Sequence, residues 1–264
     1  MERNFKVYEE IFEKYVNKFI EKAEGDEARK LNFTNKKIHS YHVRDNILKI
    51  AKEEKLNVDM FIVEFIGLFH DIGRFYQYDK YETFNDDLSD NHGKLSVKVL
   101  EDEGIINMID YDLRPYIVDP ILMHNMKDLP RLNDKKMYLY SALLRDADKL
   151  DGFRSISVYE RENKNLAYFK NKSDEPIISE EVFNNIMNHK SVYKYNLKTV
   201  LESQIVSLGY ITSDINFYTT LRIIKENNYT KKMFEKMQDT PESRKIYNFV
   251  NDYIERRLSN EKEQ

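Results

Sequence analysis

The stretch Leu68-Phe69-His70-Asp71-Ile72-Gly73-Arg74 places a histidine and an aspartate side by side at the end of an apolar segment, just before a glycine. Further candidate ligands lie on both sides of it: His42 upstream, and His92, His124 and the aspartate-rich run 145–151 downstream. Imidazoles and carboxylates together suit Mn, Fe, Zn or Mg ions that act on phosphate esters. The pattern therefore predicts a metal centre assembled from distant parts of the chain.

The composition predicts a folded and mainly helical protein. The chain has 264 residues, of which 41% are hydrophobic and 13% aromatic, which is typical of a globular protein. Only 7 glycines and 5 prolines are present, which favours helix nearly everywhere. The net charge of −4 gives no basic field for nucleic acid, and the absence of cysteine excludes disulfides, thiolate metal sites and thiol nucleophiles.

The segment from Met1 is charged and has no apolar core of a signal peptide. No stretch approaches the roughly 20 apolar residues that cross a bilayer. We therefore expect a soluble cytoplasmic protein that has no membrane partner.

Periodicity and capping residues predict a succession of amphipathic helices. We expect Gly73 to end the helix before it, and the polar segment 77–90 to be a surface loop. The stretch 158–168 fits a strand or a helix. The predicted helices cover residues 5–23, 43–56, 60–70, 91–100, 115–123, 134–150, 179–189, 197–208, 214–225 and 242–258.

Each candidate ligand also has an ordinary structural interpretation. Taken singly, His70, His92 or His124 would more often be a hydrogen-bonded structural histidine than a ligand, but their combination reverses the odds. His39 and His42 can share one face of a helix. We favour His42, because the helix that follows it carries an apolar stripe, and we interpret His39 as a rim or substrate residue.

The run 145–151 offers two alternative ligands. On a helix, Asp146 and Asp148 point about 200° apart, so they cannot both bind one ion. The apolar stripe of this helix lies midway between them, so periodicity leaves the choice open.

In order along the chain, His42, the pair His70-Asp71 and Asp148 resemble the H…HD…D signature of the HD superfamily of metal-dependent phosphohydrolases. The piece 147–150, Ala-Asp-Lys-Leu, is similar to that family's final Ala-Asp-x-Leu motif, which favours Asp148 and leaves Asp146 as the reserve.

The resemblance covers about residues 38–155 and implies an all-α fold, a helical HD-domain bundle with additional C-terminal helices. We expect one all-α domain over 1–264, in which 38–155 is the HD metal-binding core and 156–264 a C-terminal helical extension.

Two further histidines, His92 and His124, are similar to those of the binuclear branch of the superfamily, which includes the HD-GYP phosphodiesterases and certain dinucleoside-tetraphosphate hydrolases. The chain has no Gly-Tyr-Pro motif, and Arg74 stands where HD-GYP proteins usually carry lysine. These differences argue against cyclic-di-GMP as the substrate.

The resemblance implies hydrolysis by a metal-bound hydroxide, with Asp71 bridging two divalent ions. Arg74 would bind the substrate phosphate, with Lys149 and Arg154 as weaker candidates. Mn, Fe, Zn, Ni, Co and Mg are not distinguished by such a site. The six expected metal ligands are His42, His70, Asp71, His92, His124 and Asp148.

The expected substrate is a small phosphorylated metabolite, most simply a nucleotide or dinucleotide. Long nucleic acid is not expected to bind, because the segment before His92 is acidic. The alternatives on the same scaffold are a nucleotide-sensing module without hydrolysis, against which the complete ligand set argues, and a di-iron oxygenase. The acidic residues of that segment are Asp79, Glu82, Asp86, Asp87 and Asp90.

Overall fold

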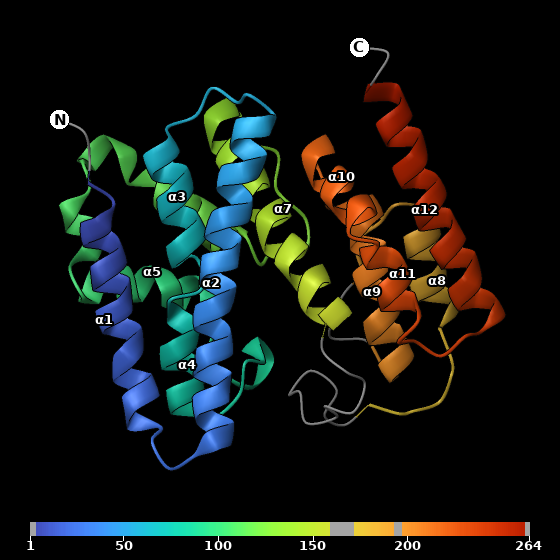
Figure 1. Ribbon diagram of the computed structural model, residues 1–264, viewed down its shortest axis with the longest axis horizontal. Helices are drawn as coiled ribbons and strands as arrows, with labels where there is room; N and C mark the ends of the chain where they lie inside the picture. The colour runs from blue at the N-terminus through green and yellow to red at the C-terminus, as the bar shows by residue number, and fades with distance from the viewer. Residues whose placement is uncertain (1–3, 159–171, 193–196, 262–264) are drawn as a thin grey trace. The chain divides into compact units, whose positions relative to one another are not determined.

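The computed structural model describes residues 4–158, 172–192 and 197–261, and these residues form helices, turns and loops without a strand (Figure 1). One isolated bridge joins the backbones of Ser173 and Thr199. The predicted all-α class, with further helices after the metal-binding region, is confirmed. The chain divides into two compact units, Met1–Asp148 and Lys149–Gln264, and the expected single domain stays a prediction.

The first unit contains the predicted metal ligands. Its helices are joined by short segments that include 3-10 turns at Asp86–Leu88, Ile105–Met108 and Tyr111–Leu113. The helices are α1 (Lys6–Lys22), α2 (Glu27–Glu53), α3 (Met60–Phe69), α4 (Gly73–Tyr81), α5 (His92–Asp102), α6 (Pro115–Met123) and α7 (Lys135–Val158), the last of which continues into the second unit.

The helix α3 lies at the centre of the first unit because it is apolar on nearly every side. The Asp59 side chain caps it by accepting a hydrogen bond from the Phe61 backbone N–H at 2.9 Å. A Cβ on Gly67 would lie 2.8 Å from the Arg44 Cα, so this glycine allows α3 to pack closely against α2. Each buried apolar side chain contributes roughly 1.5–3 kcal/mol relative to an exposed one.

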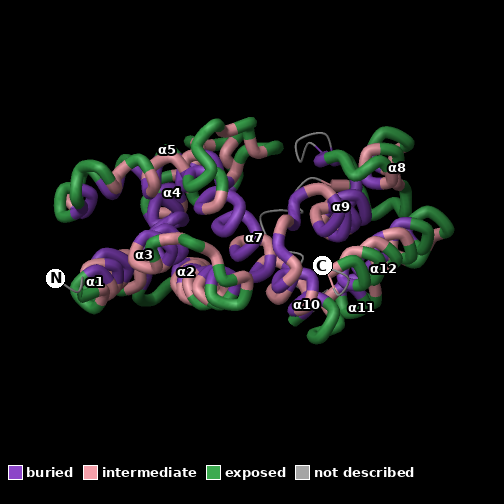
Figure 2. Tube along the Cα trace, turned by 90° about the horizontal axis from the view of Figure 1, so that it is seen from above, coloured by how far each residue is buried: buried purple, intermediate pink, exposed green. Residues whose placement is uncertain are grey.

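Phenylalanines from four helices pack together near the turn that carries His70-Asp71, which we call the HD turn. The rings of Phe65 and Phe69 on α3 are stacked with centroids 4.4 Å apart. Phe12 of α1 meets Phe69 edge-on at 5.6 Å, and Phe75 of α4 stacks with Phe33 of α2 at 6.2 Å. All five are fully or almost fully buried. Figure 2 colours buried stretches of α3 and α4 purple. The HD turn therefore directly follows a helix that is anchored in a packed aromatic cluster.

The prediction that Gly73 ends a helix is wrong, because Gly73 is the first residue of α4. A Cβ there would lie 2.3 Å from the Ser96 backbone nitrogen and 2.5 Å from the Leu95 carbonyl carbon. The Gly73 N–H donates to Ser96 Oγ at 3.0 Å. Glycine is required because the start of α4 contacts the backbone of α5, which brings α5 beside the HD turn.

Two predicted boundaries also differ. Helix α2 begins at Glu27 rather than near Val43, since Asp26 accepts a hydrogen bond from the Arg29 backbone N–H at 3.0 Å and caps it. The predicted loop 77–90 is partly helical, because α4 continues to Tyr81. The predicted helix starts at Asn91, Pro115 and Asp134 are confirmed.

In its described residues, the second unit consists of the end of α7 and five further helices. A capping box forms at Thr199 and Glu202. Ser179, which precedes α8, makes no side-chain cap and donates its backbone N–H to Glu202 Oε1 at 2.9 Å. The open prediction for 158–168 lies outside the described residues except for Val158, the last residue of α7. The helices are α8 (Glu180–Met187), α9 (Val200–Ser213), α10 (Tyr218–Glu226), α11 (Tyr229–Phe234), which was not predicted, and α12 (Pro241–Glu261).

Within the described parts of the chain, every helix falls short of the length and apolar character that a membrane-spanning segment needs.

Candidate metal centre

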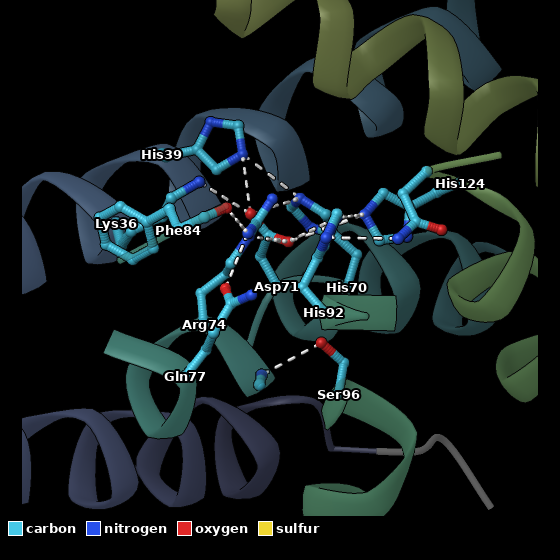
Figure 3. Close-up of polar contacts among 12 residues, drawn as sticks. Lys36, His39, His70, Asp71, Arg74, Gln77, Phe84, His92, Ser96 and His124 are labelled. Atoms are coloured by element: carbon cyan, nitrogen blue, oxygen red, sulfur yellow. Dashed lines mark hydrogen bonds and ion pairs between the residues drawn. The ribbon is translucent and has the colours of Figure 1, made fainter. Parts of the chain in front are cut away.

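Histidines from separate parts of the chain converge on Asp71, in the turn between α3 and α4 (Figure 3). Two groups have their ligand atoms within 4.8 Å of one another: His39, His70 and Asp148, and His70, Asp71 and His124. We call them the first group and the second group. They share His70, so they form one continuous centre.

The first group is carried by the faces of long helices. His39 lies on α2, with its Nε2 atom 3.3 Å from Nε2 of His70 and 3.2 Å from Oδ1 of Asp148 on α7. His70 Nε2 lies 3.7 Å from the same Asp148 oxygen. These atoms lie close enough together to share one ion.

The second group is extended by His92, the first residue of α5. His92 Nε2 lies 3.0 Å from Nε2 of His124, which directly follows α6. Asp71 Oδ1 lies 3.7 Å from His92 Nε2 and 3.6 Å from His124 Nε2. His92 therefore lies with Asp71 and His124, and we count it in the second group from here on.

The carboxylate of Asp71 faces both groups, one oxygen to each. Its Oδ2 atom lies 3.6 Å from His39 Nε2 and 3.7 Å from His70 Nε2, whereas Oδ1 faces the second group. Oδ1 is buried and has no hydrogen-bond partner among the described residues. A buried carboxylate oxygen without a donor is costly, and a bound cation would remove that cost.

The histidine rings are oriented by acceptors behind them. Nδ1 of His70 lies 3.0 Å from the Gly67 carbonyl oxygen, and Nδ1 of His124 lies 2.6 Å from that of Ile121. A carbonyl can only accept, so each Nδ1 carries the proton and each Nε2 presents a lone pair to the centre. This tautomer is the one that binds a divalent metal, so the donor set fits such an ion.

The electrostatics of the site also favour the metal-binding protonation states. Burial lowers the pKa of His70, and burial together with Arg74 lowers the pKa of His92 to about 3. Burial opposes ionisation of Asp71, yet Lys36 and His70 hold the pKa of that carboxyl well below its usual range. Burial likewise opposes ionisation of Asp148, but its histidine neighbours hold its pKa well below the usual range. Neutral imidazoles and ionised carboxylates are the forms that bind metal.

The geometry favours His39, and not the predicted His42, as the first histidine. His42 lies three residues later on α2 and belongs to neither group within the described residues. The predicted helix began only at residue 43, after both histidines, but α2 begins at Glu27, so both lie well inside the helix. We therefore propose His39 in place of His42 as the ligand on α2, and the choice between them stays a prediction.

The choice of Asp148 over Asp146 agrees with the geometry, since only Asp148 belongs to a group in the described part of the chain. Asp146 is fully buried. The neighbouring residue Arg145 makes hydrogen bonds that the sequence did not reveal. The buried Arg145 side chain donates to the carbonyl oxygens of His124 at 3.1 Å and Met126 at 2.6 Å, and so joins α7 to the segment that carries His124.

The three predicted substrate cations are placed differently from one another. Arg74 is buried beside the centre, with Nε 3.6 Å from Asp71 Oδ1. In the second unit, Lys149 pairs with Asp214 at 3.4 Å and Arg154 with Asp151 at 2.6 Å. Arg74 thus lies beside the metal centre within the first unit.

Sequence reasoning missed Lys36, whose ammonium donates to Asp71 Oδ2 at 3.0 Å. It lies one helical turn before His39 on α2, and its side chain is 17% exposed. The signal was the spacing of three residues from His39, which places both on one helix face. That signal required the correct start of α2.

The acidic segment before His92 is less repulsive than its sequence indicates. Asp79 pairs with Lys22 at 2.7 Å and with Arg29 at 2.8 Å. Asp86 turns inward and pairs with Arg74 at 3.1 Å. The charge argument against long nucleic acid therefore depends mainly on the exposed members of the segment.

A comparison with protein families matches residues 37–152 to the HD domain. No curated protein and no solved structure matched the chain. The matched region contains His39, the His70-Asp71 turn and Asp148 in the family's order, and the structure brings them together in a buried cluster. The chain therefore carries an HD domain, the domain of the HD family of metal-dependent phosphohydrolases.

Proposed function

We propose that the protein hydrolyses a small phosphorylated metabolite at a site for two divalent metal ions. The observation that carries the proposal is the Asp71 carboxylate, which turns one oxygen to each group of ligands. The proposed ligands of the first ion are His39, His70, Asp71 and Asp148, and those of the second ion are Asp71, His92 and His124.

When bound, two such ions activate a water molecule and neutralise charge on the reacting phosphate. The chain's own residues hold the histidines as Nδ1–H tautomers and keep Asp71 and Asp148 ionised. The burial of His70 and Asp71 excludes bulk water and strengthens their electrostatic interactions.

The substrate phosphate requires a cation that it can reach. Lys36 meets this need best, because it contacts Asp71 Oδ2 and its side chain is partly exposed. Its ammonium also lies 5.4 Å from the centre of the Phe84 ring, a distance typical of a cation–π contact. Arg74 flanks the other Asp71 oxygen. Lys149 pairs with Asp214 in the second unit, so we leave it outside the proposed site.

The test is a hydrolysis panel with protein purified without chelator and supplied with Mn, Fe, Zn, Ni, Co or Mg. Mononucleotides, dinucleoside polyphosphates and an aryl phosphate are assayed beside single- and double-stranded DNA and RNA. We expect the protein to hydrolyse a small phosphate compound. This activity should persist under nitrogen and should be lost in Asp71→Asn. Cleavage of the polymers with the small phosphates untouched, or turnover that requires oxygen, contradicts the proposal.

A further inference from the structure

Asp86 accepts several hydrogen bonds beside the metal centre, although its sequence context is that of a surface loop. Its Oδ1 atom accepts from Arg74 Nη1 at 3.1 Å and from Gln77 Nε2 at 2.9 Å. Its Oδ2 atom accepts from Nδ1 of His92 at 2.6 Å and from Asn125 Nδ2 at 3.3 Å. One side chain thus joins α4, the start of α5 and the residue after His124.

Hydrogen bonds from α4 to the segment around Asp86 hold the Asp86 side chain toward the metal centre. Gln77, which is fully buried, donates to Ser89 Oγ at 2.8 Å and to the Asp90 carbonyl oxygen at 2.9 Å as well as to Asp86. Arg74 Nη1 also donates to the Phe84 carbonyl oxygen at 2.6 Å. Two side chains of α4 therefore grip the loop on both sides of Asp86 (Figure 3 shows Arg74, Gln77, Phe84 and His92).

The contact with His92 is the chemically important one. A carboxylate that accepts from Nδ1 fixes the proton there, orients the ring and makes Nε2 a stronger ligand. That Nε2 atom is the one directed to His124 and to Asp71 Oδ1. His70 and His124 use backbone carbonyls for the same purpose, whereas His92 uses a charged side chain from a loop.

We propose that Asp86 is the positioning residue of the second metal ion, and that Arg74 serves this ion by holding Asp86 in place. The inference rests on the proposed function only for the presence of a second ion. It gives Arg74 a role other than gripping the substrate. The elements that Asp86 joins carry or adjoin His92 and His124, whereas His39 and Asp148 come from α2 and α7. The effect of Asp86 should therefore fall on one ion.

The test compares Asp86→Asn with Asp87→Asn, a matched control at the next residue, which is exposed. Calorimetric titration of metal-free protein with Mn²⁺ measures the two binding events directly. For Asp86→Asn we expect the affinity of one event to fall 10–100-fold, the usual effect of removing such a partner, with the other event unchanged. Asp87→Asn should match the wild type. Retention of the unchanged event also reports that the variant is folded.

A second background separates positioning from general damage. In His92→Ala, one event should be absent, and adding Asp86→Asn should change the remaining event no further, because Asp86 acts through His92. Wild-type affinities in Asp86→Asn, equal loss of both events, or a wild type that binds a single ion would overturn the inference. Two ions bound without hydrolysis would refute the proposed function and leave this inference standing.

Discussion

The two ligand groups differ in the backbone that carries them. In the first group, His39 and Asp148 project from the faces of α2 and α7, two of the longest helices of the chain. In the second group, His92 begins a helix, His124 follows one, and Asp86, which holds His92, lies in a 3-10 turn. A ligand on a helix face is placed by the packing of the whole helix. A ligand at a helix end depends on local hydrogen bonds, so the ion held by the second group should be the easier one to remove.

The largest effect is expected at Asp71, which both groups share. Asp71→Ala should remove both ions and lower the hydrolysis rate by more than about 100-fold. This loss exceeds the effect of removing a residue that only hydrogen-bonds to a metal ligand. Elemental analysis of gently purified protein measures the metal content.

The comparison variant for Asp71 is Asp146→Ala, which alters a buried aspartate outside both groups. It should retain more metal than Asp71→Ala. The opposite order would show that the 145–151 run uses Asp146 and that Asp148 is wrongly assigned.

The next effect tests the choice between His39 and His42 as the ligand on α2. His39→Ala should reduce hydrolysis about 100-fold or more and weaken the first ion, because its Nε2 lies 3.2 Å from Asp148 Oδ1. His42→Ala, three residues away on the same helix, is the matched control and should retain its metal. Loss of metal in His42→Ala with none in His39→Ala would restore the original prediction.

A smaller loss of metal is expected in the second group. His124→Ala should lower the metal content from two ions to one, since its Nε2 atom faces Asp71 Oδ1 and His92. The remaining ion should still be held by the first group. An unchanged metal count would mean that the site is mononuclear and that His124 is structural.

The stability of the connection between the groups depends on Gly73. Gly73→Ala should lower the free energy of unfolding by roughly 1–3 kcal/mol, the usual cost of overpacking, because the new methyl meets the backbone of α5. Gly152→Ala on α7 is the control: its Cβ meets nothing within 4 Å, and removing a helical glycine should stabilise by roughly 0.5–1 kcal/mol. Thermal denaturation followed by circular dichroism distinguishes the two, and equal shifts would refute the packing argument.

Sequence reasoning recovered the parts of the molecule that local rules decide. Asn91 and Pro115 start helices as their chemistry requires, and the continuous apolar run that ends before His70 forms the largely buried helix α3. The paired His70-Asp71 lies at the centre of the cluster, in the turn after that run.

What the sequence could not provide were the residues whose role depends on tertiary packing. The choice between His39 and His42 depended on where α2 starts, which Asp26 decides by a cap within a polar stretch. Lys36 and Asp86 resemble ordinary surface charges until α2 and α4 bring them to the site.

The smallest effect is expected at Lys36, and it sharpens the comparison by separating substrate binding from metal binding. Lys36→Gln should raise the KM for a small phosphate ester about tenfold, equivalent to about 1.4 kcal/mol, because a cation within reach of the phosphate is lost. Its metal content should not fall, since the ammonium contacts Asp71 without being a ligand. Lys37→Gln is the matched control at the next residue; Lys37 pairs with Glu13 at 2.5 Å, so its loss should leave KM unchanged. Steady-state kinetics with the metal-loaded variants decides the matter. An unchanged KM in Lys36→Gln would place the phosphate elsewhere, and a loss of metal would mean that Lys36 supports the first group rather than the substrate.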